Sequence, residues 1–197
     1  MNSNPHPNLS TQSAAQKTPE KTAHPGSEFL TALTAETEHR KATAHHSITS
    51  RPIDEDCGYA HLKHDIAKAI AGRKEQLIQL LHAIHQNPET AYQERYACAE
   101  LTRAVHDAGI DVETPVYGLD TAFAATLQSA NYDPRKHRTI AILSEYDALP
   151  GIGHGCGHNV IAAAGLGAFL ALADTLQKTP DAFSGRIIYL GTPAEES

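Results

Sequence analysis

The spacing of apolar residues predicts a helical segment soon after residue 60. Between His61 and Gln86 the apolar side chains recur at intervals of three, four and seven residues, which is typical of an amphipathic helix. They are Leu62, Ile66, Ile70, Leu77, Leu80, Leu81 and Ile84. Asn87-Pro88 predicts its end, because the residue before a proline disfavours helical backbone. Residues 90–93 have the form of a capping box, so we expect a second helix that ends near Gly109.

Four short apolar and β-branched runs predict strands, at residues 110–116, 121–127, 139–144 and 186–190. The first two are joined by a turn at 118–120. The apolar run 160–177 lies between the last two and predicts a buried helix. A strand, a helix and a strand in this order predict two parallel strands of one sheet, joined by a right-handed crossover and flanked by helices. The sequence therefore indicates the α/β class.

The first 55 residues lack these periodicities. They are rich in Ser, Thr, Ala, Pro, Gln, Lys and His, and their large apolar residues cluster at Phe29, Leu30 and Leu33. Such a composition cannot bury enough surface to offset chain entropy, so we expect a disordered tail with one weak helical turn after Ser27. Residues 56–197 would then form the folded domain. The tail carries neither a secretory apolar core nor an Arg-rich presequence, which favours a cytoplasmic location.

Composition narrows the possible functions. The chain has 197 residues, 41 % of them hydrophobic, and a formal net charge of −7. This acidic balance without a basic stripe argues against nucleic acid as a partner. The longest apolar run, 160–173, is shorter than the ~20 residues of a membrane span, so no membrane is expected as a partner. Cys57, Cys98 and Cys156 are an odd number in different contexts, which does not indicate a disulfide framework.

Candidate chemistry is concentrated in the loop at residues 154–159, His-Gly-Cys-Gly-His-Asn. Imidazole nitrogen and thiolate sulfur are ligands of zinc and its neighbours in the first transition row. Glycines beside Cys156 let the backbone turn tightly, and the helix start that follows favours a thiolate, so we expect Cys156 to be ionised. The alternative is that Cys156 is a small buried residue and that the histidines cap the loop.

Acidic residues follow the two parallel strands. Asp147 comes after one strand, and Glu195 and Glu196 come after the other. Ligands in such sheets bind beyond the carboxyl ends of the strands, so these loops should meet the Cys/His loop at one edge. One glutamate could then bind a cation while its neighbour takes a proton from water. A solvated surface pair is the alternative for Glu195 and Glu196.

Four stretches, taken together, resemble successive motifs of the metallopeptidase family of aminoacylases, carboxypeptidases and acyl-amino-acid amidohydrolases. They are residues 84–89 with Glu94, 145–150, 155–159 and 191–196. The Gly-Cys-Gly-His-Asn form is most similar to the aminobenzoyl-glutamate hydrolase and cytosolic dipeptidase branch. Many relatives that hydrolyse auxin or acetyl conjugates have Asp where this chain has Asn159.

The resemblance implies a three-layer α/β sandwich with a mainly parallel central sheet. It implies that Cys156, His158 and Glu196 are metal ligands, that Glu195 is the general base and that Asp147 is an orienting aspartate. It transfers no role to His154 or Glu145, and no substrate-binding residue. For His85 and Glu89 we favour a structural role near the site. The implied cofactor is a divalent metal, zinc or manganese, with two ions in the full-length protein.

The implied activity is metal-dependent hydrolysis of an amide or peptide bond in a small N-acyl amino acid or dipeptide. Family members continue past the Glu-Glu pair with further histidine ligands and a lid domain, so we expect this chain to be an N-terminal part of a homodimeric enzyme. Two alternatives stay open. One is a truncated, non-catalytic fragment, and the other is a cysteine hydrolase with Cys156 as nucleophile and His154 or His158 as base.

Overall fold

The computed structural model describes residues 27–47 and 59–197, which belong to two separate compact units. The N-terminal unit contains helix α1, Ser27–Ser47. It is longer than the single turn predicted from composition, because Ala, Glu, Lys and Arg are good helix formers. Ion pairs at helical spacing, Glu36 with Arg40 and Glu38 with Lys41, support it further. The remainder of the predicted tail, 1–26 and 48–55, lies outside the described residues, as do residues 56–58.

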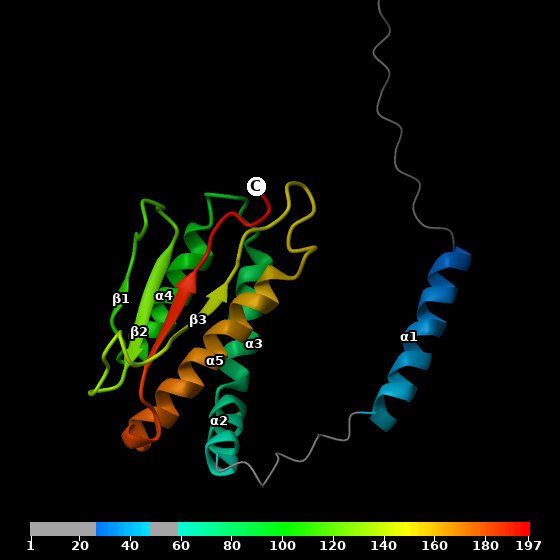
Figure 1. Cartoon of the computed structure of the whole chain (residues 1–197). Helices are drawn as coiled ribbons and strands as arrows, with labels where there is room; N and C mark the ends of the chain where they lie inside the picture. The colour runs from blue at the N-terminus through cyan, green and yellow to red at the C-terminus, as the bar shows by residue number, and fades with distance from the viewer. Residues whose placement is uncertain (1–26, 48–58) are drawn as a thin grey trace, which may run out of the picture. The chain divides into compact units, whose positions relative to one another are not determined.

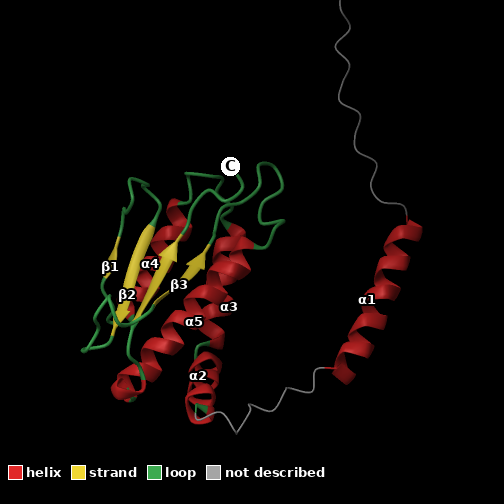
Figure 2. Ribbon diagram, viewed as in Figure 1, coloured by secondary structure: helices red, strands yellow, loops and turns green. Residues whose placement is uncertain are grey.

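The second unit contains four α-helices within the described part of the chain. They are α2, Ala60–Gly72; α3, Lys74–Gln86; α4, Arg95–Asp107; and α5, His158–Lys178. A 3-10 turn, Pro180–Ala182, follows α5. Helices α2 and α3 pack along α5 (Figure 2).

The prediction of one helix over residues 61–86 is wrong, because the helix breaks at Arg73. Arg73 has φ −100° and ψ 2°, which takes it out of the helical ladder. Its guanidinium forms a fork with both carboxylate oxygens of Asp174 on α5, at 2.9 and 2.8 Å. The apolar period continues across the break, so the sequence pattern does not reveal it.

The predicted capping box at residues 90–93 is also wrong. Helix α4 begins at Arg95, and the first free amides of the helix, those of Tyr96 and Ala97, donate to the Glu89 carboxylate at 2.9 and 3.1 Å. A side chain before the turn thus replaces the expected local cap. The predicted helix ends are confirmed, since α3 stops at Gln86 and α4 stops two residues before Gly109, which has φ 76°.

The sheet has four strands in the order β1-β2-β4-β3. They are β1, Val112–Glu113; β2, Phe123–Gln128; β3, Thr139–Ser144; and β4, Arg186–Gly191. Strand β1 is shorter than predicted because Pro115 cannot donate to a strand ladder. Figure 1 shows β4, in red, between β2 and β3.

Strands β3 and β4 are parallel and joined through α5, as the strand-helix-strand order predicts. In the described residues the sheet is mixed rather than mainly parallel, since β2 is antiparallel to both β1 and β4. Parallel neighbours need a crossover, usually a helix, and β3-α5-β4 is the one such connection in the described part. The polar loop between β2 and β3 instead reverses the direction of the chain.

The core lies on one face of this sheet. Phe123, Tyr189 and Ile187 point to the same face by register and pack with apolar residues of α3, α4 and α5. The α/β class is confirmed. Three layers are not seen in residues 59–197, because the helices described there cover this face, whereas Leu143 on the other face of β3 remains 53 % exposed.

Helix α5 passes closest to the sheet. Gly165 allows this approach, because a Cβ there would collide with Ser144 Oγ and lie 3.2 Å from the Leu143 carbonyl oxygen. By length and composition α5 could cross a membrane, and among the described helices it is the one that could. Leu166, Phe169 and Leu170 are fully buried in the core, as the prediction of a buried helix requires.

Candidate metal centre

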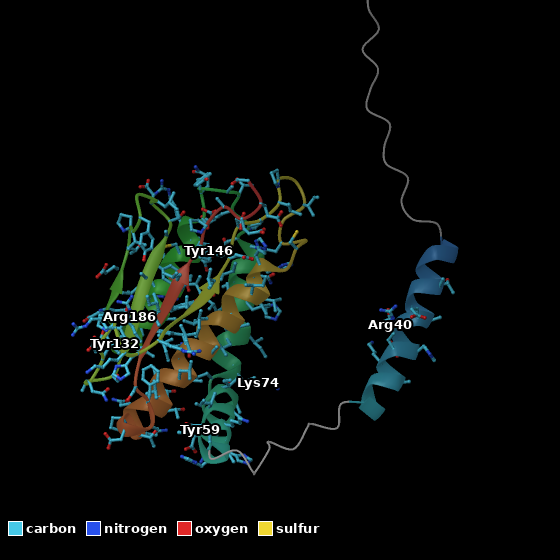
Figure 3. The ribbon with its side chains drawn as sticks, in the orientation of Figure 1. Arg40, Tyr59, Lys74, Tyr132, Tyr146 and Arg186 are labelled. Atoms are coloured by element: carbon cyan, nitrogen blue, oxygen red, sulfur yellow. The ribbon has the colours of Figure 1, made fainter. Side chains whose placement is uncertain are left out.

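Parallel pairing brings two loops to one edge of the sheet. The arrowheads of β3 and β4 point to the same side, where the loop before α5 and residues 192–197 lie (Figure 1). The pairing continues past the strands, because the Thr192 amide donates to the Ser144 carbonyl at 2.9 Å. Tyr146 lies below these loops and donates its hydroxyl to the Thr121 carbonyl oxygen (Figure 3). This buried ring supports the start of the loop after β3.

His158 is the first residue of α5 and is only 4 % exposed. Gly157 precedes it with φ 84°, a left-handed conformation that a glycine adopts without strain. The Nδ1 atom of His158 lies 2.9 Å from Asp147 Oδ1 and 3.0 Å from the Asp147 carbonyl oxygen. Both are acceptors, so Nδ1 carries a proton, and in the neutral ring the free lone pair is on Nε2.

Asp147 links the two loops. It is 1 % exposed, and its second carboxylate oxygen accepts a hydrogen bond from the Glu196 amide at 2.9 Å. One buried carboxylate therefore fixes both the imidazole of His158 and the backbone that carries Glu196.

The free Nε2 of His158 faces three carboxylates. It lies 3.5 Å from Glu145 Oε2, 3.6 Å from Glu195 Oε2 and 3.7 Å from Glu196 Oε1. Potential ligand atoms of Glu145, His158 and Glu195 all lie within 4.8 Å of one another. Converging negative charges repel unless a cation lies between them, and imidazole with carboxylates suits zinc or manganese. The residues therefore fit a divalent cation.

Cys156 lies at the rim of this group and is exposed. The neighbouring Glu196 carboxylate, followed by slight desolvation and the charges of Glu196 and Glu195, raises the pKa of Cys156 above its ordinary value. In these surroundings the carboxylates therefore oppose the ionisation of Cys156 that the start of α5 would favour. The structure places Cys156 next to Glu196, and both lie outside the three residues whose potential ligand atoms are all within 4.8 Å of one another.

Glu145 was given no role by sequence reasoning, yet its carboxylate belongs to the group. The available signal was its position, since it directly follows β3 at the same edge as Asp147. Glu89 has the structural role that we favoured, because it caps α4 and its carbonyl accepts the Ala148 amide at 2.8 Å.

His154 and His85 lie beside the group rather than within it. Their rings are 6.2 Å apart, and burial lowers the pKa of His154 below its ordinary value. Neither ring nitrogen of His154 has a hydrogen-bond partner in the described part of the chain.

Comparison with characterised proteins finds relatives that match about two thirds of this chain. No family model matches the chain. The Xaa-Arg dipeptidase of Mus musculus is 41 % identical over 140 residues, which are 68 % of this chain and 32 % of the relative. One of the subunits of the p-aminobenzoyl-glutamate hydrolase of Escherichia coli is 28 % identical over 148 residues, 66 % of this chain and 29 % of the relative. The chain thus spans about a third of the length of these curated relatives.

Solved structures also match a large part of the chain. A putative aminohydrolase from methicillin-resistant Staphylococcus aureus superposes with a TM-score of 0.55 at 26 % identity, over 68 % of this chain and 36 % of that one. The YXEP protein of Bacillus subtilis, a dinuclear metal binding peptidase from the M20 family, superposes with a TM-score of 0.52 at 25 % identity, over 62 % and 36 %. By these likenesses in sequence and fold, the chain belongs to the M20 metallopeptidase family of aminoacylases, carboxypeptidases and acyl-amino-acid amidohydrolases.

Proposed function

We propose that this chain carries the metal-binding and general-base loops of a hydrolase that cleaves an amide or peptide bond in small N-acyl amino acids or dipeptides. The convergence of His158 Nε2 with the carboxylates of Glu145, Glu195 and Glu196 carries the proposal. The names of the relatives, Xaa-Arg dipeptidase and p-aminobenzoyl-glutamate hydrolase, support this substrate class.

The proposed cofactor is zinc or manganese, as two ions in the working enzyme. Support comes from the acidic group around His158 and from the dinuclear metal binding of the Bacillus subtilis relative. We propose Cys156, His158 and Glu196 as ligands, with Glu145 close enough to join them. Bound divalent cations would supply positive charge that polarises the amide carbonyl and lowers the pKa of water.

The proposed roles of the other residues follow from their positions. The Glu195 side chain is 51 % exposed, so its carboxylate can reach a water in the site, take its proton and pass it to the leaving amine. Asp147 accepts from Nδ1 of His158, which fixes the ring so that Nε2 faces the carboxylates. Asp147 thus acts through His158.

The proposed setting is a homodimeric cytoplasmic enzyme with no nucleic-acid or membrane partner. Light scattering on a purified sample tests the assembly state.

Cation binding is the primary test, because the chain spans about a third of the length of its relatives. Zinc and manganese affinities of the 197-residue chain would be measured by titration calorimetry, with hydrolysis of Xaa-Arg dipeptides, aminobenzoyl-glutamate and acetyl amino acids as the second readout. We expect Glu195→Gln to retain cations and to lower turnover about 10²–10⁴-fold, since an amide cannot accept the proton.

Glu75→Gln is the matched control, because this exposed carboxylate lies in the first turn of α3. A wild-type chain that binds neither cation would overturn the proposal. Activity that resists chelation but is lost on thiol alkylation would instead assign the chemistry to Cys156.

A further inference from the structure

A buried carboxylate outside the metal-binding group connects three distant segments. Glu94, just before α4, has no exposed surface. Its Oε1 atom accepts the backbone amides of Tyr92 at 3.0 Å and Ala194 at 2.9 Å. Its Oε2 atom accepts the hydroxyl of Thr121 at 2.9 Å. All three partners are donors, and they match the two acceptor oxygens of a carboxylate.

Both backbone partners of Glu94 have unusual conformations. Tyr92 and Ala194 each have φ 63°, in the left-handed region that costs free energy for any residue with a Cβ. Such conformations persist where several surrounding contacts hold the backbone in place. Charge-assisted hydrogen bonds are about twice as strong as neutral ones, so the Glu94 carboxylate is well suited to hold them.

Ala194 directly precedes the functional glutamates. The loop is fixed on one side of Glu195 by the bond from the Ala194 amide to Glu94, and on the other by the bond from the Glu196 amide to Asp147. If Ala194 left the left-handed region, the chain direction after it would change. The carboxylates of Glu195 and Glu196 would then move away from His158.

We propose that Glu94 is a positioning residue of the metal centre, which holds Ala194 in its left-handed conformation and so aims Glu195 and Glu196 at His158. The inference rests on the proposed function. Glu94 does not contact the metal-binding atoms and acts only through the loop.

Glu94→Met tests this proposal, because methionine fills a similar volume but removes both acceptor oxygens. Without added metal, we expect hydrogen exchange of the Ala194 amide to become at least about tenfold faster. With zinc or cobalt, affinity should fall about 10–100-fold, the usual cost of losing an outer support of a metal site, and the visible spectrum of bound cobalt should change. Glu94→Gln keeps one acceptor oxygen, so its effects should be smaller.

Glu100→Met is the matched control, because Glu100 lies on α4 and pairs with Arg103 at the surface. It should leave both the exchange and the cation affinity unchanged. The near-ultraviolet circular dichroism of each variant reports whether the core is intact.

A glycine rescue separates positioning from general stability. Glycine adopts positive φ without penalty, so adding Ala194→Gly to Glu94→Met should recover part of the cation affinity. A residue that only stabilised the fold would show no such recovery. If Glu94→Met does not fold, the same rescue is measured on Glu94→Gln.

Unchanged Ala194 exchange in the folded Met variant would overturn the proposal, as would unchanged cation affinity or absence of rescue. A wild-type chain without cation affinity would instead refute the proposed function, and the exchange experiment would still decide whether Glu94 holds the loop.

Discussion

At the residue scale, one aspartate determines how the imidazole of His158 is used. The bond from Nδ1 to Asp147 fixes the tautomer, and burial of both side chains excludes water that would compete for this bond. The lone pair on Nε2 therefore points at the carboxylates. A histidine without such a partner could rotate or exchange tautomers.

The thiol of Cys156 makes a testable contribution at the same scale. Cys156→Ser replaces a soft sulfur with a hydroxyl, a poorer ligand for zinc, so we expect zinc affinity to fall about tenfold or more while manganese affinity changes less. Competition with a chromophoric chelator measures both constants. Because Cys156 is exposed, the substitution should leave folding intact, and an unchanged thermal midpoint would verify this. Equal zinc affinity in the two proteins would remove Cys156 from the ligand set.

Sequence position locates Asp147, His158 and Glu196 near one another, because parallel strands joined by a helix end at the same edge. It does not give the protonation of Cys156, which depends on carboxylates about 40 residues further along the chain. Glu94 is a similar case, since its bond to Ala194 spans 100 residues.

At the element scale, the close contact of α5 with β3 is possible because Gly165 has no side chain. A glycine inside a helix normally costs about 1 kcal/mol relative to alanine, so Gly→Ala is often stabilising. At Gly165 we expect the reverse, a loss of about 1–3 kcal/mol, because the added methyl collides with Ser144 Oγ. Urea denaturation of Gly165→Ala measures this difference.

Gly72→Ala provides the comparison, since a Cβ at this last residue of α2 meets no atom within 4 Å. It should leave the free energy of unfolding unchanged or slightly higher. Equal effects of the two substitutions would contradict the close approach of α5.

The existence and type of the longer elements follow from local periodicity, which is why α4, α5, β3 and β4 were predicted well. The break between α2 and α3 at Arg73 could not be predicted in this way, because it accompanies an ion pair with Asp174, which lies 101 residues further along the chain. The start of α4 was missed for a related reason, since its cap, Glu89, lies outside the local window that a capping box uses.

At the scale of the whole molecule, the two units should be thermodynamically separable. Among the described residues, the buried core cluster lies within residues 80–189. Deleting residues 1–55 should therefore leave the thermal midpoint of the second unit within about 2 °C, since no residue of this cluster is removed. Differential scanning calorimetry of both chains measures this. A large decrease would show that the N-terminal unit packs on the second unit.

The position of β4 has a consequence for how the molecule folds. This strand is central in the sheet, yet it comes after every other described element, and its partners lie far back in the sequence, as in the pairing of Phe123 with Gly191. Long-range pairing of this kind slows folding, because a long loop must close before the contacts form. During synthesis on the ribosome, β2 and β3 are therefore made before the strand that pairs with both of them. Their apolar surfaces remain exposed, and can bind chaperones, until residue 191 has been synthesised.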